Sequence, residues 1–259
     1  MEKFLVPFSI ILAGLIVAGS ILVTGEKITF PQVLGFSLPF IKNNQPLDSS
    51  KKETEKVVEA TPQPKQPPLP QSLKDGDLGT NPILGNSTAK VAISVFSDYQ
   101  CPFCGQFVFD VMPKLRSDYI DKGLVKFVVR DLAFLGPESK DAALATKCAS
   151  VQGKYWEYHD YLFKYIGDKE KQNPRVSQEN NGNFSAANLK KFAKTLGLNT
   201  SKFNTCFDGR TFDVDVKADV DSARNYAVFS TPTVYVNGKF YDNRYGYDGL
   251  YPLIDSLIR

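Results

Sequence analysis

The sequence predicts an α/β domain that carries an all-helical insertion and follows an N-terminal membrane anchor and a linker. Three observations support this prediction. An uncharged apolar run extends from Phe4 to Gly25, a proline-rich stretch with the sequence TPQPKQPPLPQ follows it, and the remainder mixes β-branched runs with helical apolar spacing. We therefore expect a transmembrane anchor at 1–25, a flexible linker at 26–72 and a folded domain at 73–259.

The apolar run is about as long as the ~20 residues that a membrane-spanning helix needs. A cleavable signal peptide has a shorter apolar region of roughly 7–15 residues, so the length favours a retained anchor. The Ala-Gly-Ser sequence at 18–20 leaves cleavage open as the alternative. Lys3 precedes the run and the charges after it nearly cancel, which favours a single-pass protein of the cell membrane with its C-terminal domain on the extracytoplasmic side.

Residues 26–72 lack the periodic apolar face that a core requires, and their proline-rich end predicts an extended, semi-rigid spacer. This spacer is either a tether that holds the domain off the membrane or a linker with no specific length requirement. The formal net charge is only +3 over 259 residues, and no dense cluster of Lys and Arg occurs. The sequence therefore gives no indication of a nucleic-acid partner.

The folded domain is predicted to open with a βαβ unit. KVAISVF from Lys90 and LVKFVVR from Leu124 are rich in β-branched residues and predict two strands. Between them, apolar residues recur at helical spacing from Phe107 to Leu115, with a kink or break expected at Pro113.

The rest of the domain is predicted to be an insertion followed by a hairpin and a helix. Helical patterns fill about 137–225 and are separated by Gly, Asn and Pro. TPTVYVNGKFYDN then predicts a hairpin that turns at Asn237 and Gly238, and YDGLYPLIDSLI predicts a closing amphipathic helix. The predicted order is βαβ, helices, ββα.

Two cysteines, Cys101 and Cys104, follow the first predicted strand and lie one helical turn apart. At the start of a helix, unpaired amide groups and the helix dipole stabilise a thiolate, which is the form that attacks disulfides. Pro102 suits a first helical turn because it has no N–H to leave unpaired. An exposed, acidic Cys101 with Cys104 as its resolving partner is the pair that thiol-disulfide exchange requires.

Two other roles for this pair are weaker. A zinc site needs two more ligands, but the remaining cysteines, Cys148 and Cys206, are far apart in sequence and His159 is the only histidine. We therefore predict no metal. A purely structural bridge between Cys101 and Cys104 closes too short a loop to stabilise the fold much.

Three segments together carry a family resemblance: FSDYQCPFC, CASVQGKYWEYHDYLF and STPTVYVNG. They resemble the DsbA-like thiol-disulfide oxidoreductases of the thioredoxin superfamily, close to the membrane-anchored, Gram-positive BdbD type. The resemblance runs from about Asp77 to Arg259 and implies a thioredoxin fold. It also implies a cis peptide bond before Pro232, beside the cysteine pair, which leaves the backbone near Thr231 free to pair with an extended substrate. A trans proline that opens an edge strand is the alternative.

The sequence departs from the family at Phe103. The most oxidising members carry histidine at this position, where it helps to stabilise the thiolate, and phenylalanine cannot supply that charge. We therefore expect a weaker oxidant than DsbA, at about −120 mV, but a stronger one than thioredoxin, at about −270 mV.

Cys148 and Cys206 belong to different segments of the predicted insertion. An even number of cysteines in an exported chain favours a structural disulfide between them, with two buried free thiols as the alternative and a second redox relay ranked below both. We expect His159 on a helix surface or at a cap, Trp156 in the packing of the insertion against the core, and Asp98 either as a turn cap or as a group that tunes the nearby thiols.

The predicted function is an extracytoplasmic oxidase that donates the Cys101–Cys104 disulfide to exported proteins with cysteine thiols. The resemblance implies an integral-membrane, quinone-reducing partner of the DsbB or VKOR type that reoxidises the pair, and no organic cofactor. The alternatives are a reductase or isomerase, and a redox-inactive, membrane-tethered binding or chaperone module.

Overall fold

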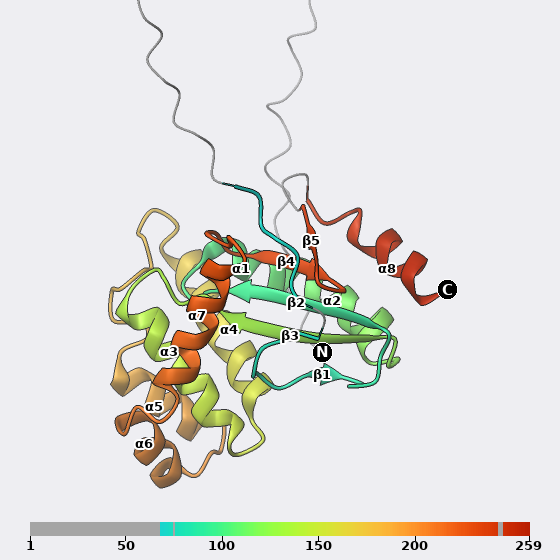
Figure 1. Cartoon of the computed structure of the whole chain (residues 1–259). Helices are drawn as coiled ribbons and strands as arrows, with labels where there is room; N and C mark the ends of the chain where they lie inside the picture. The colour runs from blue at the N-terminus through green and yellow to red at the C-terminus, as the bar shows by residue number, and fades with distance from the viewer. Residues whose placement is uncertain (1–67, 75, 243–245) are drawn as a thin grey trace, which may run out of the picture. The chain divides into compact units, whose positions relative to one another are not determined.

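A computed structural model describes residues 68–74, 76–242 and 246–259 (Figure 1). The predicted anchor and most of the predicted linker lie outside these residues. Among the residues that are described, no helix is both long enough and apolar enough to cross a bilayer. All of them belong to one compact unit, Gln63–Arg259.

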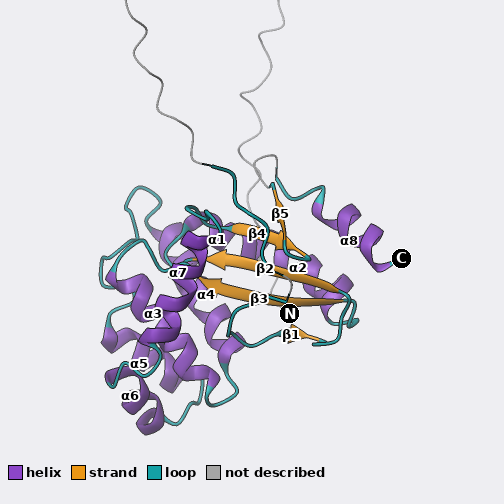
Figure 2. Cartoon of the chain, in the orientation of Figure 1, coloured by secondary structure: helices purple, strands orange, loops and turns teal. Residues whose placement is uncertain are grey.

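A five-stranded sheet forms the centre of the domain, in the order β1-β3-β2-β4-β5 (Figure 2). Its strands are β1 (Leu84–Gly85), β2 (Val91–Ser97), β3 (Val125–Asp131), β4 (Thr233–Val236) and β5 (Lys239–Tyr241). β2 and β3 run parallel, with Val95 opposite Val129, and the other neighbours are antiparallel. Both central strands are almost wholly buried, which explains their continuous apolar sequences.

A helical connection joins β2 to β3 and completes the predicted βαβ unit. Its segments are α1 (Pro102–Gln106), η1 (Phe107–Val111), α2 (Met112–Leu115) and η2 (Arg116–Ile120), of which η1 and η2 are π-helical. The expected disturbance at Pro113 takes the form of the wide η1 turn before it. Proline has no N–H to donate and its ring crowds the carbonyl group one turn back, so a wider turn keeps the helix continuous.

The helical insertion lies between β3 and β4, as predicted. It consists of α3 (Pro137–Ser150), α4 (Tyr155–Gln172), α5 (Ala186–Thr195), α6 (Thr200–Asp208) and α7 (Asp213–Asn225). Figure 1 shows α3, α5 and α6 grouped at the end of the sheet toward which the arrowheads of β2 and β3 point. The sequence analysis did not identify α6 as a separate helix, although Asn199 caps it by accepting a hydrogen bond from the Lys202 amide at 3.0 Å.

The predicted hairpin and closing helix are both present. β4 and β5 meet at a turn in which Asn237 and Gly238 have positive φ angles of 48° and 74°, as a type I′ turn requires. The closing helix α8 (Leu250–Ile258) buries Leu250 and Ile254 against the sheet core. The strand β1 was not predicted, because a strand as short as Leu84–Gly85 has no alternation to detect.

Buried ion pairs fasten the insertion to the sheet. Arg130 on β3 donates from Nε to Asp219 Oδ1 on α7 at 3.0 Å. Lys147 on α3 lies 3.4 Å from Asp131 Oδ2 and 3.6 Å from Asp219 Oδ2. Both cations and both carboxylates are buried, so removing one partner would leave an uncompensated buried charge. The packing of the helices against the sheet therefore depends on charged residues as well as apolar ones.

Candidate active site

Cys101 and Cys104 lie at the start of α1, shortly after the end of β2. Cys101 is the N-cap residue of α1, and Pro102 occupies its first turn, as predicted. The Cys101 carbonyl oxygen accepts hydrogen bonds from the Cys104 amide at 3.0 Å and from the Gly105 amide at 3.1 Å. These bonds fix Cys104 one turn beyond Cys101, and both residues are free thiols in this structure.

The thiols are less exposed than the sequence analysis expected. Cys101 is 7% exposed and Cys104 is 1% exposed, whereas Phe103 between them is 65% exposed. The sequence analysis expected an exposed Cys101, and this expectation is wrong, because little of its surface reaches solvent. The loop before β4 helps to cover Cys101, because the carbonyl oxygen of Thr231 in this loop lies 3.4 Å from the Cys101 thiol.

The peptide bond between Thr231 and Pro232 is cis. The alternative of a trans proline opening an edge strand does not apply, since β4 lies between β2 and β5 inside the sheet. The Thr231 hydroxyl is buried and makes no other hydrogen bond among the described residues, so it is free to donate to the Cys101 thiolate. The loop thus presents both a backbone carbonyl and a hydroxyl donor beside Cys101.

The surroundings of Cys101 favour its thiolate. The Cys104 thiol lowers the pKa of Cys101 most, the Thr231 hydroxyl and the amides of Cys104 and Phe103 lower it further, and burial opposes them, with a result of about 6. An ordinary cysteine thiol is mostly protonated at neutral pH. Cys101 is instead mainly ionised there.

Cys104 has the opposite character. Burial is the largest cause that raises its pKa well above the ordinary value, and the neighbouring Cys101 raises it further. Cys104 therefore remains a protonated thiol at neutral pH. The pair thus combines an acidic thiol that is a good leaving group with a buried thiol that ionises with difficulty.

An open cavity of about 410 Å³ lies beside the pair. Its lining comes from α1 and η1, from the cis-proline loop and from the segment before α8, and comprises Phe103, Gln106, Asp110, Val111, Ser230, Thr231, Pro232, Gly246 and Tyr247. The predicted residues Phe103, Thr231 and Pro232 therefore share one cavity. Gln106 and Tyr247 were not predicted. Tyr247 is more than a hundred residues from the cysteines in sequence, and the helical pattern around Gln106 does not show which side chains border a cavity.

Asp98 acts as a turn cap. Its Oδ2 accepts from the Phe134 and Leu135 amides at 3.0 and 3.1 Å, and its Oδ1 accepts from the Gln100 amide at 2.8 Å and from the Ser139 hydroxyl at 2.6 Å. Burial raises the pKa of Asp98, while these bonds lower it. Of the two roles considered for Asp98, the capping role is the one that these contacts support.

We expect alkylation of the reduced protein to occur at Cys101 first and to accelerate as the pH rises through about 6, because the reactive thiolate forms there. Cys104 reacts much more slowly, because it is buried and its pKa is raised. The measurement is the rate of iodoacetamide labelling against pH, with the labelled residue located by peptide mass mapping. A midpoint near that of a free cysteine would contradict the assigned electrostatics.

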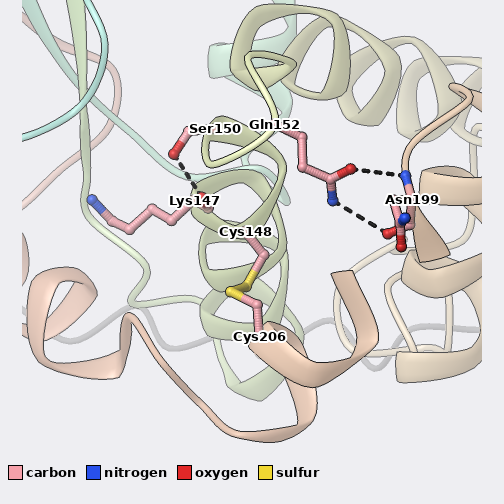
Figure 3. The surroundings of a disulfide bond; sticks show 6 residues. All are labelled: Lys147, Cys148, Ser150, Gln152, Asn199 and Cys206. Carbon is pink, nitrogen blue, oxygen red and sulfur yellow. Dashed lines mark hydrogen bonds between the residues drawn. A yellow bond between two sulfur atoms is a disulfide. The ribbon is translucent and has the colours of Figure 1, made fainter. Parts of the chain in front are cut away.

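Cys148 on α3 and Cys206 on α6 form a disulfide, with their Cα atoms 5.8 Å apart (Figure 3). This is the pairing that the sequence analysis favoured over two free thiols. Next to it, Gln152 and Asn199 exchange two hydrogen bonds, of 2.8 and 3.3 Å, between the same parts of the insertion. The disulfide therefore lies within the insertion and belongs to its packing.

The structure confirms the prediction for Trp156 on α4 but not the one for His159 on the same helix. Trp156 packs against Phe127 of β3, with ring centroids 5.8 Å apart, which agrees with its predicted packing role. The prediction for His159 is wrong: it is 2% exposed and packs among aromatic rings that include Tyr99 and Phe163. Helical spacing places it on the apolar face of α4.

No cluster of three or more His, Cys, Asp or Glu in the described part of the chain is arranged to hold a metal ion.

An acidic thiol beside a second thiol, next to an open cavity, defines the class of thiol-disulfide oxidoreductases. The chain belongs to the thioredoxin family, whose model matches residues 77–256. It is 33% identical to disulfide bond formation protein D of Bacillus subtilis over 180 residues. These residues make up 69% of this chain and 77% of that protein.

The solved structure of oxidised BdbD from Bacillus subtilis superposes with a TM-score of 0.63 at 31% identity, covering 73% of this chain and 98% of that one. A third similarity covers only part of a longer protein. The Na(+)/H(+) antiporter NhaA 1 of Salinispora arenicola is 28% identical over 178 residues, which are 68% of this chain but 24% of the antiporter. The family match and the similarities to the two Bacillus subtilis proteins confirm the thioredoxin-like fold and establish a DsbA-like protein thiol-disulfide oxidoreductase.

Proposed function

We propose that this protein is an extracytoplasmic oxidase in which Cys101 and Cys104 form the catalytic disulfide and donate it to exported proteins that carry cysteine thiols. The observation that carries the proposal is the contrast between the two thiols, since the pKa of Cys101 is lowered to about 6 and that of Cys104 is raised. A stabilised Cys101 thiolate favours the reduced enzyme, and an enzyme with a stable reduced form is a strong oxidant.

The reaction begins when a substrate thiolate attacks the sulfur of Cys101 in the oxidised enzyme. The Cys101–Cys104 bond breaks, Cys104 takes up a proton, and a mixed disulfide joins the substrate to Cys101. The second thiolate of the substrate then attacks the first substrate sulfur in this mixed disulfide, forms the substrate disulfide and expels Cys101 as a thiolate. The substrate loses two electrons and two protons, and the enzyme gains the two electrons as a dithiol.

The acidity of Cys101 and the burial of Cys104 favour this outcome. Cys101 leaves readily because its thiolate is stable, and protonated Cys104 attacks the mixed disulfide slowly, which leaves time for the second substrate thiol. Thr231 and Pro232 border the cavity beside Cys101, where an extended substrate segment can pair with the backbone. Pro102 and Phe103 form the exposed surface between the cysteines.

Repeated turnover needs an electron acceptor, because every donated disulfide leaves the enzyme reduced. An integral-membrane protein of the DsbB or VKOR type, which passes the electrons to a quinone, is the partner that we propose. The predicted anchor at 1–25 would keep the domain close to such a partner, on the extracytoplasmic side of the membrane.

We expect the Cys101–Cys104 pair to have a reduction potential between about −120 and −270 mV, the values of DsbA and thioredoxin. The lowered pKa of Cys101 raises the potential above that of thioredoxin, while Phe103 supplies no charge that would bring it to that of DsbA. Equilibration with glutathione buffers, followed by alkylation and mass analysis, measures the fraction oxidised. A potential well above about −200 mV supports the oxidase, whereas a value near −270 mV would favour the reductase alternative.

A further inference from the structure

We propose that Gln100 is a positioning residue for thiol-disulfide exchange, which holds Cys101 at the start of α1 by tying the preceding turn to α3 and to the α4–α5 loop (residues 173–185). This inference rests on the proposed function, because it takes Cys101 as the reacting thiol. It adds a part of the helical insertion to the residues that determine the chemistry of that thiol.

Gln100 directly precedes Cys101, is 1% exposed and does not line the cavity beside the cysteine pair. Its Nε2 donates to the Ser139 hydroxyl at 2.7 Å, and its Oε1 accepts from the Asn180 amide at 2.6 Å. A buried carboxamide with both ends hydrogen-bonded is held in one orientation, since releasing either end leaves a buried polar group unpaired. The residue next to Cys101 is therefore fixed on two sides.

The two segments to which Gln100 is bonded, the start of α3 and the α4–α5 loop, are themselves tied together. Asn180 donates from Nδ2 to the Leu135 carbonyl oxygen at 2.6 Å, and its φ of 49° is a conformation that such contacts help to maintain. Glu138 accepts from the Gly182 amide at 2.6 Å and from the Phe184 amide at 2.7 Å. The start of α3 and the α4–α5 loop thus form one hydrogen-bonded unit, to which Gln100 attaches the turn before Cys101.

The same turn has a second attachment through Asp98, which accepts from the Gln100 amide and from the Ser139 hydroxyl. Ser139 is therefore shared by Asp98 and the Gln100 side chain. Asp98 restrains the backbone of the turn, but the Gln100 side chain alone connects it to the α4–α5 loop among the described contacts of the turn. Removing that side chain frees one side of the turn and leaves the other in place.

The position of Cys101 matters because its thiolate is stabilised by short-range contacts. The Cys104 thiol, the Thr231 hydroxyl and amides of α1 act only within hydrogen-bond distance of the sulfur. A turn with more freedom lets the sulfur move away from them, so the thiolate is less stable. The reduced enzyme is then disfavoured relative to the disulfide form, and the oxidant becomes weaker.

The test uses the full chain, purified in detergent, with Gln100→Ala and Gln100→Met. The methionine variant keeps most of the side-chain volume and removes the hydrogen bonds, so it remains informative if the alanine variant folds poorly. We expect the pKa of Cys101, followed by thiolate absorbance, to rise by about half a unit or more. The equilibrium constant with glutathione should shift about threefold toward the oxidised enzyme, which corresponds to ~15 mV.

Gln178→Ala is the matched control. Gln178 is a second buried glutamine of the α4–α5 loop, but its hydrogen bonds to Val176, Asn181 and Asn183 stay within that loop. Its replacement should leave the pKa of Cys101 unchanged even if the melting temperature falls. If both Gln100 variants lower the melting temperature but leave the pKa and the glutathione equilibrium at their wild-type values, Gln100 is only structural and the inference is overturned. An ordinary pKa for Cys101 in the wild-type protein would instead contradict the proposed function itself.

Discussion

Replacing Cys101 by serine should abolish disulfide transfer to a peptide that carries two thiols. A serine hydroxyl forms no disulfide and stays protonated at neutral pH, so neither the catalytic disulfide nor the mixed disulfide with the substrate can form. The measurement is the rate of peptide oxidation by the stoichiometrically oxidised full chain, followed by mass analysis. Unchanged activity in Cys101→Ser would support the binding or chaperone alternative and contradict the assigned chemistry.

The Cys104→Ser variant gives a sharper test of the order of events. It keeps the Cys101 thiol, so it can form a mixed disulfide by exchange with an already oxidised peptide, but it has no internal thiol to resolve that bond. We expect a trapped adduct of enzyme and peptide in Cys104→Ser and none in Cys101→Ser. Since burial and a raised pKa keep Cys104 from attacking external disulfides, an adduct on Cys104 would contradict the roles proposed for the two residues.

A third variant controls for the general effect of losing cysteines. The double replacement Cys148→Ala and Cys206→Ala removes a disulfide that lies within the insertion and leaves Cys101 and Cys104 intact. This variant should still oxidise the peptide under conditions in which it stays folded. Loss of transfer in all three variants, with the fold intact, would indicate that the activity does not belong to the Cys101–Cys104 pair alone.

The local part of the site could be predicted from the sequence, because it depends on neighbours along the chain. Cys101, Pro102 and Cys104 follow a strand pattern and open a helical one, and this places the thiols at a helix start. The contribution of Thr231 and Pro232 came from the family resemblance. Physical reasoning from the sequence cannot bring together segments that are 130 residues apart without knowing how the sheet closes.

The burial of the thiols and the network around Gln100 could not be predicted for the same reason. Gln100 in FSDYQCPFC resembles any polar residue in a turn, and its partner Asn180 lies 80 residues further on. The ion pairs of Arg130 and Lys147 were also missed, because charged residues inside strand and helix patterns are normally assigned to the solvent side. Long-range polar contacts leave little trace in local periodicity.

The fold was easier to predict, because apolar periodicity and turn residues determine most of its elements. The parallel pair β2 and β3, the Asn237-Gly238 hairpin and α8 all have strong local patterns, and all are present. The failures are short or interrupted elements. β1 is too short to show alternation, and α6 follows α5 so closely that only its Asn199 cap marks the boundary.

Loss of the Cys148–Cys206 disulfide should lower the free energy of unfolding by about 4 kcal/mol, because the bond closes a loop with a sequence separation of 58 residues and so restricts the unfolded chain. The experiment is cleanest in a chain that carries Cys101→Ser and Cys104→Ser, in which a reductant can act only on this bond. Urea unfolding with and without reductant then compares the same sequence in two states.

The expected result is a large shift of the urea midpoint, together with alkylation that adds the mass of two labels only after reduction. Further replacement of Cys148 and Cys206 by alanine should remove the sensitivity to reductant, since no disulfide is then left to break. If reduction changes the mass but not the midpoint, the disulfide stabilises the folded insertion no more than the unfolded chain, and the entropic account is wrong for this protein. If alkylation adds two labels without any reductant, the two cysteines are free thiols, the alternative that the sequence had left open.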